Sequence, residues 1–139
     1  VINLERTNLR YITAEQIPEA LDLAVMDVSF ISIRLVLPSV KALLKPEADL
    51  ICLIKPQFEA GREEVGKKGV VRDLKVHEEV VRGILDFAPG IGLSVQGLDF
   101  SPIKGPEGNI EYICWMKNSA APSAAIDAAA VVAASHEAL

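Results

Sequence analysis

Two continuous apolar runs in this chain each stop abruptly at a charged residue. The run at 23–26 stops at Asp27, and the run at 50–54 stops at Lys55. A strand buried on both faces of a parallel sheet reads as such a run until it reaches the sheet edge. In open α/β sheets, ligands bind outside the carboxyl ends of the strands. We therefore expect Asp27 and Lys55 to face one another across a site.

Segments with helical spacing follow each of these runs, so the chain alternates in the manner of an α/β protein. Ser32 is suited to cap a helix whose apolar positions run from Ile33 to Leu44, and Pro38 inside it predicts a kink or a late start. Asp73 is suited to cap a second helix that stops at Pro89 and Gly90. A loop is expected between them at 57–72. Strands are expected at 1–5, 8–12, 22–27, 49–55, 91–100 and 110–117.

The last two expected strands are joined only by the short turn at 101–109, so they should pair in antiparallel fashion. If the final strand runs against the parallel ones, its beginning lies at the edge where they end. Glu111 would then join Asp27 and Lys55. From the residues alone, two readings stay open. The three charges either form a site or are strand-end charges that merely meet solvent.

The composition fits one domain or part of one, because 139 residues with 50% hydrophobic content can bury a single core. No signal peptide is apparent, and the apolar stretches are shorter than the roughly 20 residues that span a bilayer, which predicts a soluble cytoplasmic protein. Cys52 and Cys114 lack CxxC or Cys/His spacing, so buried free thiols are expected and no metal site. His77 is expected to be solvated. The Ala-rich tail predicts a weakly packed or frayed helix, or otherwise a partner-binding helix.

The net charge of −5 argues against indiscriminate binding to nucleic acid or anionic membranes. The segment 55–75 is different, since it holds six basic and four acidic residues and carries a net charge of +2. It is either a solvated loop of mixed charge or a guide for a polyanion entering the crevice. Its bases are Lys55, Arg62, Lys67, Lys68, Arg72 and Lys75.

Five motifs in order carry a resemblance to a known family. They are LERTNLR at 4–10, DVSFIS at 27–32, IKPQFEAGR at 54–62, GKKGVVRD at 66–73 and SPIKGPEGNIE at 101–111. Together they resemble the TlyA family of FtsJ-like ribosomal RNA 2′-O-methyltransferases, which are often labelled hemolysins. The resemblance runs from residue 1 to about residue 118 and leaves out only the tail.

The resemblance implies a Rossmann-like methyltransferase sheet with one antiparallel strand, and S-adenosylmethionine as cofactor. Asp27, Lys55 and Glu111 match the last three members of the family's Lys-Asp-Lys-Glu tetrad. The first Lys, the cofactor's Gly-rich loop and an RNA-binding S4 domain have no counterpart in this chain. We therefore expect an N-terminally truncated methyltransferase domain at 1–118, followed by the tail at 119–139, and weak cofactor binding by the chain alone.

The resemblance also implies roles for single residues. A ribose hydroxyl is a poor nucleophile at neutral pH, so methyl transfer needs a base or a cation beside it, and Lys55 suits either task. Asp27 would orient Lys55 and the methyl donor, and Glu111 would tune Lys55. Glu5 would accept hydrogen bonds from the cofactor ribose hydroxyls.

Ribosomal RNA or a ribosomal subunit is the implied partner. The candidate RNA-binding residues are Arg62, Lys67, Lys68, Arg72 and Lys104. Three alternatives stay open at this point: a methyltransferase that acts on another RNA or on a base nitrogen, a membrane-active hemolysin, and a catalytically silent RNA-binding remnant. The sequence lacks an amphipathic cationic helix, which counts against lysis.

Overall fold

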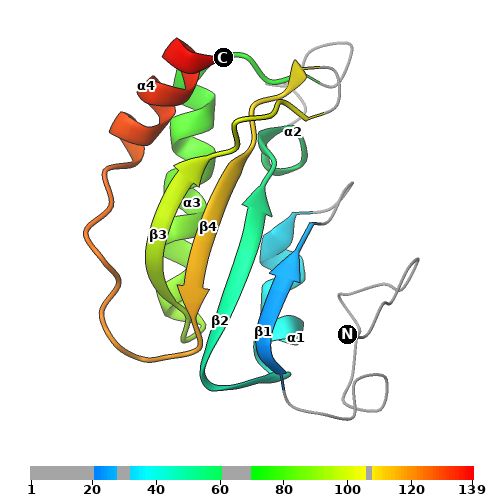
Figure 1. The fold of residues 1–139 in the computed structure, drawn as a ribbon, viewed down its shortest axis with the longest axis vertical. Helices are drawn as coiled ribbons and strands as arrows, with labels where there is room; N and C mark the ends of the chain where they lie inside the picture. Colours follow the sequence, from blue (N-terminus) through cyan, green and yellow to red (C-terminus); the bar gives the residue numbers. More distant parts are fainter. Residues whose placement is uncertain (1–20, 28–31, 61–69, 106–107) are drawn as a thin grey trace.

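The computed structural model describes residues 21–27, 32–60, 70–105 and 108–139 (Figure 1). Within these ranges the chain forms a four-stranded sheet in the order β1-β2-β4-β3. The strands are β1 (Leu21–Met26), β2 (Leu44–Ile54), β3 (Ser94–Phe100) and β4 (Tyr112–Lys117). β1 and β2 are parallel, whereas β4 is antiparallel to both β2 and β3. The predicted α/β fold with one antiparallel strand is confirmed; the strands expected at 1–5 and 8–12 lie outside the described residues.

Strand register places three chain segments at one edge of the sheet. Met26 is the last residue of β1 and pairs with Cys52, and Ile54 at the end of β2 pairs with Tyr112 at the start of β4. The residues just beyond these pairs are Asp27, Lys55 and Glu111. In Figure 1 this edge is the upper one, where β1 and β2 point and β4 begins.

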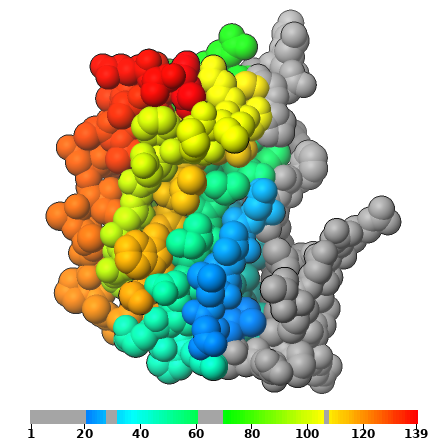
Figure 2. Space-filling model, in the orientation of Figure 1, coloured from blue at the N-terminus to red at the C-terminus, as the bar shows by residue number. Residues whose placement is uncertain are grey.

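Helices cover one face of the sheet. The 3-10 helix η2 (Ile33–Leu35), α1 (Leu37–Lys41) and α3 (Leu74–Gly90) follow β1 and β2 in the chain, and α1 and α3 lie behind the sheet in Figure 1. The opposite face exposes Leu23, Val25 and Trp115, and Figure 2 shows strand atoms at its surface. Among the described residues, no helix is long and apolar enough to cross a membrane.

The helix expected from Ile33 onward is shorter than its apolar pattern suggests. Ser32 caps η2 by accepting a hydrogen bond from Arg34 N at 3.2 Å, and Pro38 lies in the first turn of α1, which is the predicted late start. The expected helix position Leu44 instead begins β2, because it pairs with Leu21 of β1. A buried leucine is expected both on the inner face of a helix and in a buried strand, so periodicity alone could not separate these two assignments of Leu44.

A single helical turn, α2 (Pro56–Glu59), replaces the beginning of the loop expected at 57–72. Lys55 is its N-cap and Pro56 occupies its first position, where the missing N–H has no helical partner to lose. α3 begins as predicted, because Asp73 Oδ1 accepts a hydrogen bond from Lys75 N at 2.8 Å. It also ends as predicted at Gly90.

The expectation that His77 is solvated is wrong, because its side chain is completely buried on the inner face of α3. Its Nε2 lies 2.8 Å from the carbonyl oxygen of Val71, and its Nδ1 lies 2.8 Å from Nε2 of His136. Tyr112 Oη lies 3.3 Å from the same Nδ1. These partners replace the hydrogen bonds that water would otherwise supply.

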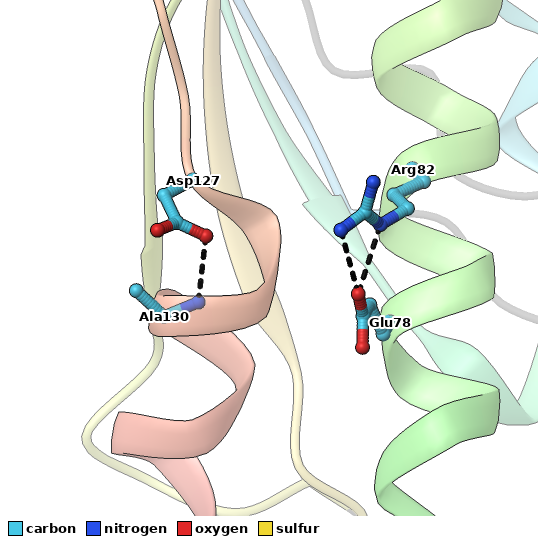
Figure 3. Close-up of polar contacts among 4 residues, drawn as sticks. All are labelled: Glu78, Arg82, Asp127 and Ala130. Atoms are coloured by element: carbon cyan, nitrogen blue, oxygen red, sulfur yellow. Dashed lines mark hydrogen bonds and ion pairs between the residues drawn. The ribbon is translucent and has the colours of Figure 1, made fainter.

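The tail forms the expected helix, α4 (Ala128–Ala138), which is packed on α3 and β3 rather than frayed. Asp127 caps it by accepting a hydrogen bond from Ala130 N at 3.0 Å (Figure 3). Val132 and Ser135 are completely buried, and Ser135 Oγ lies 2.9 Å from Tyr112 Oη. The expectation of weak packing is wrong, because the small side chains of α4 let it approach α3 and β3 closely, and Ser135 has a buried hydrogen-bond partner in Tyr112.

Cys52 and Cys114 are buried free thiols, as expected, and lie opposite each other on β2 and β4. The remaining core is formed by apolar side chains of the sheet and of α1, α3 and α4. The edge that carries Asp27, Lys55 and Glu111 therefore rests on a continuous packed interior.

Candidate active site

Asp27 and Lys55 meet at the carboxyl ends of the two parallel strands. Lys55 Nζ forms an ion pair with Asp27 Oδ1. The two partners differ in environment, because the Lys55 side chain is 9% exposed and the Asp27 side chain is 63% exposed. The structure thus brings a nearly buried cation against a carboxylate that still faces solvent.

Glu111 lies at the same edge, one residue before β4. It is only 7% exposed, and its Oε2 accepts a hydrogen bond from Gln57 Nε2 at 3.1 Å. Its carbonyl oxygen accepts a hydrogen bond from Ser101 N at 2.8 Å. The carboxylate also packs directly on Gly105, where a Cβ atom would lie 2.6 Å from Glu111 Cδ. These contacts fix the buried acid in place, and Gln57, which bonds to it, follows Lys55 by two positions in the chain.

Gln57 is a site residue that sequence reasoning missed. Its Oε1 atom is buried and, in the part of the chain that the structure describes, has no hydrogen-bond partner. Buried amide oxygens normally accept a hydrogen bond, and exceptions need an explanation. A buried amide acceptor without a described partner therefore lies beside Glu111.

Glu59 is the second residue that was missed. Its Oε1 accepts a hydrogen bond from Ser32 Oγ at 2.7 Å, and its Oε2 accepts one from Ile33 N at 3.0 Å. Burial raises the pKa of Glu59, and the hydrogen bonds from Ser32 and Ile33 oppose that rise. The signal in the sequence was the alternation of Lys55, Gln57 and Glu59 directly after a buried strand.

The candidate RNA-binding residues are only partly described. Arg62, Lys67 and Lys68 lie outside the described residues, whereas Arg72 and Lys104 are exposed. Glu5, the residue expected to bind the cofactor ribose, also lies outside the described residues. A hydrogen bond of 2.9 Å from Val71 N to Asn109 Oδ1 ties the chain before α3 to the turn before Glu111. Arg72 and Lys104 therefore belong to two linked segments next to the site.

No group of three His, Cys, Asp or Glu side chains suitable for a metal ion occurs within the described ranges. The described arrangement is an ion pair, a buried acid and a buried amide at a sheet edge. Such a set can orient polar groups of a ligand and stabilise charge at an oxygen atom.

A family model of FtsJ-like methyltransferases matches residues 1–118. The chain belongs to the FtsJ-like methyltransferase family. The resemblance to TlyA is also confirmed, since TlyA of Mycobacterium tuberculosis is 42% identical over 117 residues, covering 84% of this chain and 44% of TlyA. That relative is named a 16S/23S rRNA (cytidine-2′-O)-methyltransferase.

Two further comparisons agree with this family. YqxC of Bacillus subtilis, provisionally named an rRNA methyltransferase, is 51% identical over 114 residues, which cover 81% of this chain and 41% of YqxC. A solved structure from Streptococcus thermophilus, provisionally named a hemolysin, superposes with a TM-score of 0.90 at 39% identity, covering 96% of this chain and 49% of that one. The chain spans less than half the length of these relatives.

Proposed function

We propose that this chain carries catalytic residues of a cytoplasmic ribosomal RNA 2′-O-ribose methyltransferase that uses S-adenosylmethionine. The observation that carries the proposal is the Asp27–Lys55 ion pair at the carboxyl ends of two parallel strands, beside the buried Glu111. The FtsJ-like family and the naming of TlyA as a cytidine-2′-O-methyltransferase support the choice of reaction.

Asp27 has the properties of a group that binds the cofactor. Its carboxylate is largely exposed at the end of β1, where it can accept hydrogen bonds from ammonium or hydroxyl groups of a ligand. S-adenosylmethionine offers both kinds of donor and supplies an electrophilic methyl group. Glu5 is proposed to accept hydrogen bonds from the ribose hydroxyls of the cofactor.

Lys55 is the group proposed to act on the ribose hydroxyl of the RNA. Because its side chain is nearly buried, its charge is poorly screened by water and acts strongly on an oxygen that is losing a proton. Asp27 holds the Lys55 head group at the strand end, and Glu111 places a second carboxylate at the same edge. The Gln57 amide nitrogen holds the Glu111 carboxylate through a hydrogen bond of 3.1 Å.

Basic side chains around this edge are proposed to hold the RNA backbone. Arg72 and Lys104 are exposed next to the site, and Arg62, Lys67 and Lys68 complete the set in the sequence. Contacts from such residues to phosphate position a nucleic acid without reading its bases.

Substitution of Lys55 tests the proposal in a full-length protein that carries this segment. We expect Lys55→Met to lower the single-turnover rate of ribosomal RNA methylation roughly 100-fold or more, the usual scale of acid–base catalysis. Stability should stay within about 1 kcal/mol, because the Asp27 left behind is well hydrated. Lys55→Arg separates two roles, since arginine keeps the positive charge but accepts no proton.

Lys45→Met is the matched control. Lys45 forms an ion pair of 3.0 Å with Asp22, which joins the same two strands away from the site edge. This variant should methylate at the parental rate. Neither the variant nor the parent should release dye from liposomes. Near-parental turnover of Lys55→Met, with normal melting, would refute the proposed mechanism.

A further inference from the structure

The α2 turn that begins at Lys55 is too short to hold its own position. It contains four residues, and one helical turn gains too few hydrogen bonds to offset the ordering of its backbone. Contacts with other segments must therefore fix it. At its N-cap, Lys55 pairs with Asp27, and at its end, Glu59 binds Ser32 and Ile33.

Gln57 of α2 also bonds to Glu111, and α2 packs on α3, but the contacts of Lys55 and Glu59 both reach one stretch of chain. Asp27 is the first residue after β1, and Ser32 is the N-cap of η2. Glu59 satisfies a donor at the start of η2, because Ile33 N has no hydrogen-bond partner within that helix and donates to Glu59 Oε2. The Ser32 hydroxyl donates to Glu59 while it accepts from Arg34 N. Glu59 therefore anchors the end of α2 to a capped and ordered element.

We propose that Glu59 is a positioning residue that keeps Lys55 against Asp27 by fastening α2 to the start of η2. Its two hydrogen bonds, to Ser32 and Ile33, carry this role more than its charge does, although the Arg34 guanidinium also attracts the carboxylate. None of the proposed catalytic groups is among its hydrogen-bond partners in the described chain. The catalytic part of this inference rests on the proposed function; the structural part does not.

The positioning role is tested first in this chain by a measurement that does not depend on enzymatic activity. The side-chain ammonium signal of Lys55 in nitrogen-15 NMR persists when an ion pair shields its protons from exchange. Glu59→Met should broaden or remove this signal at temperatures well below melting. Glu59→Gln should keep it, because its amide oxygen can accept from Ile33 N and its amide nitrogen can donate to the Ser32 hydroxyl. Ser32→Ala, which breaks the link from the other side, should weaken the signal even if Glu59→Met fails to fold.

Glu78→Met is the matched control, because the hydrogen bonds that the described residues give Glu78 stay within its own helix. Its Oε1 accepts hydrogen bonds from the Arg82 guanidinium at 2.7 and 3.0 Å, on α3 and away from the site (Figure 3). This variant should leave the Lys55 signal unchanged. If Glu59→Met and Ser32→Ala lowered the melting temperature but kept the Lys55 signal, Glu59 would be a structural residue only, and the inference would be overturned.

Methyl transfer in a full-length protein that carries this segment then tests the catalytic consequence. Glu59→Met should lower the single-turnover rate about 10- to 100-fold, the scale of a misplaced catalytic group, and Glu59→Gln should restore most of it. An equal loss in Glu59→Gln would overturn the claim that the hydrogen bonds carry this role more than the charge does. If Lys55→Met itself kept its rate, the proposed function would fail, and the NMR result would still decide whether Glu59 positions Lys55.

Discussion

Replacing Gly105 with alanine tests how tightly the turn before β4 holds the buried acid of the site. The Cβ atom of an alanine would lie 2.6 Å from Glu111 Cδ and 3.0 Å from its Oε1. Gly105 is not among the described residues with a positive φ, so alanine can adopt its backbone conformation. The whole effect of Gly105→Ala should therefore come from its contact with Glu111.

The expected loss of stability follows from what Glu111 must give up. Glu111 is 7% exposed as a residue and its carboxylate is bonded to Gln57, so the carboxylate cannot turn into water without breaking that bond. A hydrogen bond to a charged group contributes about 1.5–3 kcal/mol, and overpacking by one methyl group costs about 1–3 kcal/mol. We expect Gly105→Ala to lower the free energy of unfolding by about 2 kcal/mol.

Chemical denaturation followed by the fluorescence of Trp115, the one tryptophan in the chain, measures this change. Gly90→Ala is the control, because nothing lies within 4 Å of a Cβ at that position, and it should change stability by no more than about 0.5 kcal/mol. In a Glu111→Ala background the clash is gone, so Gly105→Ala should cost little there. Equal costs in both backgrounds would refute the reasoning.

Two further predictions concern buried groups. Burial, and then the nearby His136, lower the pKa of His77 below its ordinary 6.5, although the hydrogen bond with Val71 opposes this. Below about pH 6.5, the unfolded chain therefore binds a proton at His77 more readily than the folded chain does. The free energy of unfolding should fall as the pH drops from about 6.5 through the folded-state pKa. An NMR titration midpoint of His77 at or above 6.5 would contradict this. The hydrogen bond with Cys114, followed by burial, holds the pKa of Cys52 well above its usual range. Because both thiols are buried, iodoacetamide should leave them unmodified in the native chain at pH 8 and alkylate them in urea, whereas fast labelling of the native chain would show that they are accessible.

Local patterns in the sequence were sufficient to place Asp27, Lys55 and Glu111 at one edge of the sheet. Apolar runs that stop at Asp27 and Lys55 marked the ends of two parallel strands, and a short turn predicted the antiparallel strand that brings in Glu111. These features are readable because a strand's burial and its pairing with a close neighbour depend on nearby residues. Asp73 as a helix cap was readable for the same reason.

Tertiary structure alone decided which polar side chains are buried and which residues are their hydrogen-bond partners. His77 is buried because its partners Val71 and His136 come from other segments, the latter 59 residues away. Glu59 reaches Ser32 across 27 residues, and Gln57 reaches Glu111 across 54. A polar residue has the same local pattern whether water or a distant side chain satisfies it, since hydrogen-bond partners far along the chain leave no period in the sequence.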